Sequence, residues 1–162
     1  MEVREARPEE YDEAGRVTAL AYREFARPGD RDWEAYLERI ADVASRARVA
    51  PVLVAVEDGR ILGSATLELD GRIEDDDPPI EPDEAHVRML GVHPDHRGRG
   101  VARALMEACV ERARAAGRTR LTLATTRRMT AAQRMYERMG FERRADRVFP
   151  DGFVLLRYEK AI

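Results

Sequence analysis

The chain has 162 residues, of which 44% are hydrophobic and 36% are charged, a composition typical of one globular domain and not of a disordered segment. Its 28 basic residues are outnumbered by 31 acidic ones, and the net charge of −3 disfavours general nucleic-acid binding, which requires a positive field. Because Cys109 is the only cysteine, an intramolecular disulfide and a cysteine-rich metal site are both excluded.

The sequence contains no pattern that predicts membrane insertion or export. Its longest strongly apolar run, at residues 52–56, is far shorter than the roughly 20 residues that a membrane-spanning helix needs. Residues 1–8 lack the apolar core of a signal peptide. We therefore expect a cytoplasmic protein with a single domain over residues 1–162, no membrane partner and no nucleic-acid partner.

The first third of the chain predicts a short strand followed by two helices. The strand is expected at residues 3–6, and the apolar spacing that follows predicts a helix to about residue 25. Pro28 and Gly29 should end this helix. Asp32 is a good N-cap for a second helix over residues 33–44, in which apolar residues recur at helical spacing.

The next segment predicts a β-hairpin and then an exposed loop. Two apolar runs at residues 52–57 and 61–69 flank Asp58-Gly59, a pair that favours a tight turn with two positive φ angles. Residues 70–84 are polar and proline-rich, with an acidic run at residues 74–77. We interpret this segment as a solvated loop.

From residue 85 onward the pattern alternates between strands and helices. The expected elements are a strand at residues 86–92, a helix at 99–116, a strand at 121–125, a helix opened by a capping box at 130–133, and a strand at 153–158. Gly117 and Gly140 should end the two helices. Cys109 lies on the apolar stripe of the first helix and is expected in the core.

This order of elements predicts an α/β fold (mixed α+β). A hairpin supplies antiparallel strands, whereas the strand–helix–strand units supply parallel ones, so we expect a mixed central sheet flanked by helices. The crossover connections should be right-handed.

The most informative segment is the glycine-containing loop before the helix at residue 99. A helix N-terminus exposes unpaired backbone N–H groups and a partial positive charge, and therefore can hold an anion. Gly98 and Gly100 leave room for a phosphate, and Arg97, Arg99 and Arg103 add positive charge around the same mouth. The segment does not fit a dinucleotide fingerprint or a nucleotide P-loop.

Residues 89–102, with the sequence MLGVHPDHRGRGVA, resemble the acyl-CoA-binding motif of the GNAT superfamily of N-acyltransferases. The motif core is Arg/Gln-x-x-Gly-x-Gly/Ala, and Arg97, Gly100 and Ala102 match it. Residues 132–141, AQRMYERMGF, resemble the second motif of that family, a helix with a tyrosine before Gly-Phe. One departure is Met129, which stands where the family often has asparagine.

The resemblance implies a sheet that is splayed open between the strands at 86–92 and 121–125, with acetyl-CoA or another acyl-CoA as co-substrate in the splay. It implies that backbone groups of Leu90 and Val92 pair with the pantetheine arm, and that backbone amides of the glycine loop hold the pyrophosphate. The cofactor-binding residues expected around that loop are Arg97, Gly98, Arg99, Gly100, Val101, Ala102 and Arg103.

The chemistry requires a base and an acid. Deprotonating an alkyl ammonium at pH 7 costs about 4–5 kcal/mol, so a base near the amine is expected. His86 matches the position of a glutamate that serves as base in many family members, and Glu84 or bulk water are open alternatives. Tyr136 matches the tyrosine that meets the departing thiolate, and it is the predicted acid. His93 and His96 lie in a predicted turn without a third partner, so no metal site is expected.

These observations predict an N-acyltransferase that moves an acetyl group from acetyl-CoA to a primary amine of a small molecule or peptide, by direct attack in a ternary complex. A non-catalytic acyl-CoA sensor or adaptor is the main alternative, and a mononucleotide-binding protein is a weaker one. The acidic run and the negative net charge favour a cationic acceptor. No motif defines the oligomeric state, and the sequence is compatible with a homodimer.

Overall fold

The fold is that of a computed structural model, which describes residues 1–25, 32–74 and 76–162. These residues form an eight-stranded mixed sheet in the order β1-β2-β3-β4-β5-β8-β6, with β7 paired to β8. The strands are β1 (Glu2–Glu5), β2 (Val52–Glu57), β3 (Arg60–Glu68), β4 (Glu84–Val92), β5 (Arg120–Thr125), β6 (Glu142–Arg143), β7 (Arg147–Val148) and β8 (Val154–Ala161).

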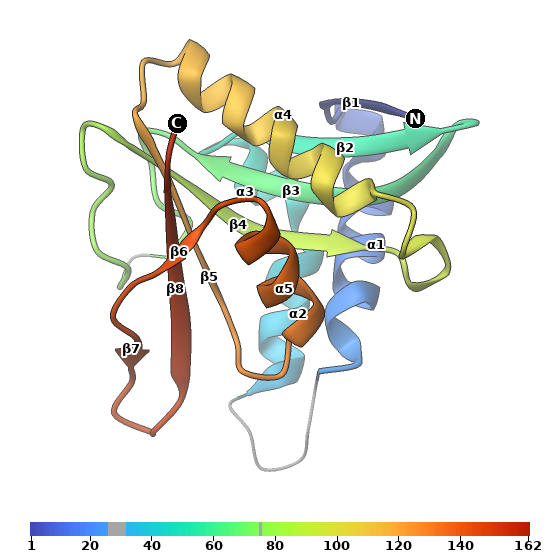
Figure 1. Cartoon of the computed structure of the whole chain (residues 1–162). Coiled ribbons are helices and arrows are strands. Elements are labelled where there is room, and N and C mark those ends of the chain that lie inside the picture. The colour runs from blue at the N-terminus through green and yellow to red at the C-terminus, as the bar shows by residue number, and fades with distance from the viewer. Residues whose placement is uncertain (26–31, 75) are drawn as a thin grey trace.

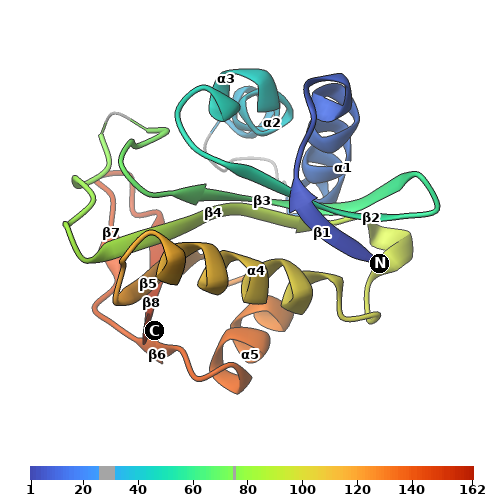
Figure 2. The ribbon, with the colours of Figure 1, turned by 90° about the horizontal axis from the view of Figure 1, so that it is seen from above.

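Helices cover both faces of the sheet. The α-helices are α1 (Tyr11–Arg23), α2 (Trp33–Ala41), α3 (Val43–Ala47), α4 (Val101–Ala115) and α5 (Thr130–Arg138), and short 3₁₀ turns lie at Pro8–Glu10 and Pro94–His96. Figures 1 and 2 show α1, α2 and α3 on one face and α4 with α5 on the other. The predicted mixed sheet flanked by helices is thereby confirmed. None of the described helices combines the length and apolarity needed to cross a membrane.

The larger core lies between the sheet and α4. Leu105, Met106 and Cys109 of α4 are fully buried in one cluster with sheet residues such as Leu62 and Leu121. Burial raises the pKa of the Cys109 thiol to about 12. Cys109 is therefore a core residue, as its place on the apolar stripe predicts, and its thiol stays protonated at neutral pH.

The hairpin and the first cap follow the sequence prediction. Asp58 and Gly59 have φ angles of 50° and 73°, the two positive values that a primed hairpin turn requires. The Asp32 side chain accepts a hydrogen bond from the Ala35 amide at 3.2 Å. The Pro28-Gly29 break lies outside the described residues.

Two helix predictions are wrong. The helix expected over residues 33–44 ends at Ala41, because Asp42 leaves the helical conformation and its carboxylate accepts from the Ser45 amide, which caps α3. The capping box expected at residues 130–133 does not form, because α5 starts one residue earlier than that pattern requires, with Met129 as N-cap. Gln133 instead donates to the Thr126 carbonyl.

The elements that the sequence did not predict are α3 and the two-residue strands β6 and β7. Strands of this length are too short to show an alternating pattern. In β6 both residues, Glu142 and Arg143, are charged and exposed, and pairing with β8 alone defines the strand.

The feature of the sheet that matters most for function is the separation of β4 from β5. Their parallel pairing runs from Glu84 opposite Arg120 to Val87 opposite Leu123, and β4 then continues to Val92 alongside β3 only. A bulge in β4 accompanies the separation, where Met89 adopts a φ of 53°. The sheet therefore opens from residue 88 onward, as the family resemblance implies.

The bulge also reverses which face each β4 side chain occupies. Ala85 and Val87 pack in the cluster on the α4 face, but Met89 packs in the cluster with Leu37 and Ile40 of α2. Without a bulge, residues of the same parity would share one face. Beyond the bulge Leu90 packs toward α4, so β4 contributes side chains to both sides of the opening.

Candidate active site

A cavity of about 660 Å³, here called the splay cavity, lies between β4, β5, α4 and α5. Residues from the end of α1 close one side of it. Eight of the nine residues expected to bind the cofactor line this cavity: Leu90, Val92, Arg97, Gly98, Gly100, Val101, Ala102 and Arg103. They come together because the segment from β4 to α4 runs along the opening of the sheet.

The glycine loop presents an open helix N-terminus to the splay cavity. Gly98 and Gly100 have φ angles of 75° and 80°, which favour glycine, and Gly100 is the N-cap of α4. A Cβ atom added at either glycine would meet no described atom within 4 Å. No described side chain caps this helix, so the first amides of its 15 residues remain available to an anion.

The arginines of the loop are not equivalent. Arg97 pairs with Glu24 and donates to the Ala21 carbonyl at 3.2 Å, which ties the loop to the end of α1. The Arg99 side chain points elsewhere. It donates to Glu57 at 2.5 Å and contacts His96, and Arg99 is not among the residues that line the splay cavity. Arg99 is therefore the one expected cofactor-binding residue that this structure does not bring to the splay cavity.

Two further arginines at the splay cavity were missed by the sequence analysis. Arg128 precedes α5 and Arg138 lies in its last turn, and both line the cavity. Arg103 faces the same space and pairs with Glu107 at 2.9 Å. Arg138 lies in the last turn of α5, where the helix dipole favours a basic residue whether or not it binds a ligand. The sequence therefore did not mark Arg138 as a binding residue.

Tyr136 of α5 lines the splay cavity and is only 5% exposed. Its ring packs against Phe141 and Tyr158, with ring centroids 5.9 and 5.8 Å away. Burial raises the pKa of Tyr136 well above its ordinary value, so the phenol stays protonated at neutral pH. Among the described residues none forms a hydrogen bond with this hydroxyl, which leaves a protonated donor at the cavity wall.

A second cavity of about 310 Å³, here called the aromatic cavity, lies on the α2 side of the sheet. Its aromatic lining consists of Tyr22, Trp33, Tyr36, Phe149 and Phe153. The two cavities meet at the opening between β4 and β5, where both are lined by Tyr22, Val87, Met89, Ala124, Thr125 and Met129. A ligand bound in one cavity would therefore lie beside a ligand bound in the other, because the same residues contact both spaces.

His86 lines the aromatic cavity and is fixed by a hydrogen bond. Its Nδ1 atom lies 2.8 Å from the hydroxyl oxygen of Thr122 on the neighbouring strand. Burial, followed by the positive charges of Arg72 and Arg88, lowers the pKa of His86 to about 3. At neutral pH the imidazole is therefore uncharged and keeps one nitrogen lone pair.

Glu84 lies on the same face of β4 as His86, but it lines neither cavity. Its Oε2 atom accepts a hydrogen bond from the Thr122 hydroxyl at 2.5 Å. The two candidate bases of the sequence analysis are consequently linked through one threonine. Thr122 is a site residue that the sequence analysis missed, because only the strand register brings it opposite His86.

The interpretation of residues 70–84 as a solvated loop holds for most of its described acidic residues, such as the exposed Asp76, but it is wrong for Glu74 and Asp77. The Asp77 side chain is 7% exposed and forms ion pairs with Arg88, with Arg72 at 3.1 Å and with Arg147 at 2.7 Å. Burial opposes the charge of Asp77, but Arg88 and Arg147 outweigh it and hold the pKa below its usual value. Asp75 lies outside the described residues.

The same charge network includes two glutamates. Glu74 lies 3.4 Å from Arg39 and 3.6 Å from Arg88, and Glu68 is fully buried beside Arg72 and Arg88. Burial raises the pKa of Glu68 despite these neighbours. Asp77, Glu74 and Arg88 line the aromatic cavity, so the loop forms part of its wall.

No group of three or more histidine, cysteine or carboxylate side chains in the described parts of the chain is arranged to hold a metal ion. His93 and His96 lie at a 3₁₀ turn, in which His93 Nδ1 accepts from the Asp95 amide at 3.1 Å. This contact gives His93 a structural role in the turn before the glycine loop.

Comparison with known proteins identifies the family. The profile of the Acetyltransferase (GNAT) family matches residues 11–141, and the chain belongs to this family. Two mammalian relatives match part of it: a mouse member of N-acetyltransferase family 8 is 32% identical over 90 residues, and human N-acetyltransferase 8B is 27% identical over 96 residues. These alignments cover 56% and 59% of this chain, but the chain spans only 37% and 40% of the relatives' own lengths.

Solved structures share the fold. The structure of yncA from Salmonella typhimurium with its cofactor acetyl-CoA has a TM-score of 0.71 and 23% identity, over 99% of this chain and 93% of that one. A GNAT family acetyltransferase from Brucella melitensis in complex with acetyl-CoA has a TM-score of 0.62 and 25% identity, over 87% of this chain and 82% of that one. This chain thus shares its fold with two proteins whose structures contain acetyl-CoA.

Proposed function

We propose that this protein is an N-acetyltransferase that moves the acetyl group of acetyl-CoA to a primary amine. The observation that carries the proposal is the meeting of two cavities at the opening of the sheet, one beside an uncapped helix N-terminus and the other beside a neutral histidine. Family membership and the two neighbours with bound acetyl-CoA support the same activity.

Acetyl-CoA fits the residues around the splay cavity. The amides from Gly98 to Ala102 would hold the pyrophosphate, and Arg97 and Arg103 would add positive charge beside it. The outer edge of β4 at Leu90 and Val92 faces the opening of the sheet, which suits pairing with the amide groups of a pantetheine arm. The free hydroxyl of Tyr136 on the cavity wall would meet the sulfur end.

The reaction proceeds by direct attack of the amine nitrogen on the thioester carbonyl. Holding both reactants at the shared wall supplies the proximity that the reaction needs. His86 accepts the proton of the attacking amine, and the carbon–sulfur bond breaks as the carbon–nitrogen bond forms. Tyr136 donates a hydrogen bond, and then its proton, to the departing thiolate, which neutralises the charge that develops there. Neither step requires a covalent intermediate on the protein.

The aromatic cavity supports a small cationic amine or the amine of a peptide end as the acceptor. Aromatic faces attract cations, and Asp32, Glu74, Asp76 and Asp77 supply carboxylates around the same space. Arg39 and Arg88 also line this space and offset part of that negative charge. We therefore expect shape and aromatic contact to contribute more to acceptor selection than net charge does.

The proposal is tested by measuring thiol release from acetyl-CoA with a panel of amino acids, polyamines, aminoglycosides and peptides with free N-termini. We expect release that depends on one class of amine and that rises with pH as more of the amine is neutral. Tight binding of acetyl-CoA without thiol release for any amine would support the alternative function of a non-catalytic sensor or adaptor.

A further inference from the structure

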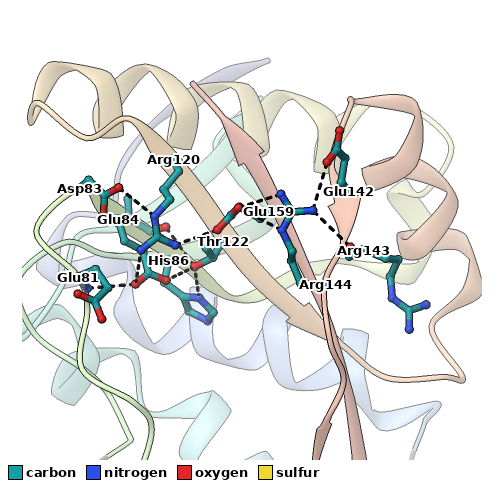
Figure 3. Close-up of polar contacts among 11 residues, drawn as sticks. Glu81, Asp83, Glu84, His86, Arg120, Thr122, Glu142, Arg143, Arg144 and Glu159 are labelled. Atoms are coloured by element: carbon teal, nitrogen blue, oxygen red, sulfur yellow. Dashed lines mark hydrogen bonds and ion pairs between the residues drawn. The ribbon is translucent and has the colours of Figure 1, made fainter.

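A chain of hydrogen bonds leads from the aromatic cavity toward the start of β4. It joins His86, Thr122 and Glu84, which lie on adjacent parallel strands with His86 directly opposite Thr122 and Glu84 directly opposite Arg120. Figure 3 shows the imidazole of His86 below the Thr122 hydroxyl and the Glu84 carboxylate to its left, with dashed lines from the hydroxyl to both. The family resemblance gives no role to Thr122.

The geometry fixes the direction of every proton in this chain. Thr122 has a single hydroxyl proton, and the Glu84 carboxylate at 2.5 Å only accepts. The alternative acceptor, the Ala85 carbonyl, lies 3.4 Å away, and a short bond to a charged acceptor is the stronger one. Thr122 therefore accepts from His86 at 2.8 Å, so the proton of the neutral imidazole is on Nδ1.

The other ring nitrogen of His86 is then the one that can act as a base. With Nδ1 protonated, the lone pair of the neutral ring is on Nε2. No described residue forms a hydrogen bond with Nε2, and His86 lines the aromatic cavity. The lone pair is thus available where the amine acceptor of the proposed reaction would lie.

We propose that His86, Thr122 and Glu84 form a proton relay that carries the proton of the attacking amine out of the aromatic cavity. This inference rests on the proposed acetyl transfer. The amine proton moves to Nε2 of His86, the Nδ1 proton moves to the Thr122 oxygen, and the hydroxyl proton of Thr122 moves to Glu84. The imidazole ends as its other neutral tautomer, Thr122 keeps one proton, and Glu84 gains one.

The charges around His86 explain why a relay suits this site better than a lone histidine. Arg72 from the loop and Arg88 from β4 oppose a positive charge on the ring, whereas Asp77 from the loop favours one. Glu68 of β3 lies directly opposite His86 in the sheet register. Burial and the two arginines prevail and lower the pKa of His86, so a proton that arrives at Nε2 has to leave from Nδ1.

The far end of the relay can release a proton. Glu84 is partly exposed at the start of β4, its Oε1 accepts from the Glu81 amide at 3.1 Å, and Arg120 lies 3.8 Å from that same oxygen. Glu159 of β8, opposite Thr122, also pairs with Arg120 at 2.9 Å. Water at this edge of the sheet can take the proton from Glu84. For the next turnover the imidazole also has to return to its first tautomer: Nε2 gives its proton to water that enters the cavity after the product leaves, and Nδ1 regains a proton from the sheet edge through Glu84 and Thr122.

Three variants separate a relay from a merely structural contact. Glu84→Gln keeps an acceptor oxygen for Thr122 but cannot take up a proton, and Thr122→Val keeps the side-chain shape but removes the hydroxyl. Both should lower kcat about 10²-fold, the lower end of what general base catalysis contributes, with an unchanged KM for acetyl-CoA. Thr122→Ser restores the hydroxyl and should recover most of the activity.

Asp83→Asn is the matched control. It removes one negative charge from the residue next to Glu84 and weakens a bond to the same Arg120, at 3.1 Å, but it does not touch the relay. It should have the kcat of the wild type. Circular dichroism and thermal melting of each variant confirm that the fold is intact before the rates are compared.

The tautomer provides a readout that does not depend on activity. The chain has 3 histidines, so the ¹⁵N–¹H spectrum of the imidazoles can be assigned by comparison with His86→Gln. We expect the Nδ1-protonated form of His86 in the wild type and in Thr122→Ser at neutral pH. A wild-type ring protonated on Nε2, or a wild-type kcat in Glu84→Gln, would overturn the relay. If the wild type transfers acetyl to no amine, the proposed function itself fails, and the relay fails with it.

Discussion

The two cavities are built by different physical means. The splay cavity offers backbone amides, glycines and arginines from one continuous stretch between β4 and α4. The aromatic cavity is assembled from side chains of α1, α2, the β3–β4 loop, β4, β5 and the segment around β8, and most of its charges already pair with one another. The first is therefore prepared for a polyanion, whereas the second is closer to neutral and selects by shape and contact.

This difference shows where each kind of substitution should act. A change at Gly98 or Gly100 blocks a ligand without disturbing the core, because no described atom lies within 4 Å of a Cβ added at either position. A change in the ion-pair network of the aromatic cavity disturbs the protein itself, because its carboxylates hold several arginines in place.

The largest effect is expected for Gly100→Glu, which should abolish acetyl-CoA binding while the protein remains folded. The new carboxylate would occupy the phosphate space and repel the phosphates. Gly117→Glu at the other end of α4 is the matched control, because Gly117 has a similar φ of 78° and an equally open surrounding. Calorimetry should show wild-type affinity for the control. Equal loss in both variants would assign the effect to the backbone instead of the site.

Tyr136→Phe should lower kcat by about 10²–10⁴-fold with little change in acetyl-CoA affinity, because its hydroxyl acts mainly on the departing thiolate. Tyr158→Phe is the control. It removes the hydroxyl of the neighbouring ring, which donates a hydrogen bond to Glu137 at 3.1 Å. Tyr158 does not line the splay cavity. Steady-state kinetics should show a much smaller change for the control. Full activity in Tyr136→Phe would return Tyr136 to a core aromatic role.

Asp77→Asn should lower the free energy of unfolding at neutral pH by about 2 kcal/mol, because it leaves Arg72, Arg88 and Arg147 partly uncompensated in a half-buried site. Asp76→Asn is the control, since Asp76 is exposed and engages Arg147 only through its backbone carbonyl. Because the pKa of Asp77 is lowered, the difference from the wild type should shrink as the pH falls below about 4. A variant as stable as the wild type in urea unfolding would show that the network contributes nothing.

The smallest effect concerns His86 and the stability of the protein in weak acid. The pKa of His86 is lowered to about 3, so between roughly pH 6.5 and that value the unfolded chain binds a proton that the folded chain does not. Acidification across this window should therefore destabilise the wild type, by up to about 1.4 kcal/mol per pH unit more than His86→Asn. Urea unfolding of both proteins between about pH 7 and 6, where the expected difference stays below about 1 kcal/mol, measures this effect. If the free energy of unfolding falls equally with pH in the two proteins, the pKa of His86 is not lowered in the folded state.

The splay cavity was largely predictable from sequence because its determinants are local. Its determinants lie within a few residues of one another: the two glycines with positive φ, Gly98 and Gly100, the start of α4 and the adjacent arginines. Inspection of the sequence alone can therefore detect them. The exception is Arg99, whose partner Glu57 comes from a distant turn. No local signal indicates which way a loop arginine points.

The aromatic cavity was not predictable in the same way, because its contacts join residues far apart in the chain. Asp77 reaches Arg147, 70 positions away, and this long-range pairing draws one carboxylate of an acidic run that looks solvated into the wall of the cavity. Thr122 becomes important only through the register that places it opposite His86. The bulge at Met89 was also invisible, since methionine gives no sign of a positive φ.

The measurement that tests direct acetyl transfer most directly is the stoichiometry of transfer at the junction of the two cavities. The wild-type protein is incubated with acetyl-CoA and the amine that the panel selects, and free thiol and N-acetylated amine are quantified together by mass spectrometry. Direct transfer predicts one acetylated amine for each thiol released, no release without the amine, and no acetyl group retained on the protein. Thiol release without an amine, or acetylation of the protein as an intermediate, would contradict direct transfer between the splay cavity and the aromatic cavity.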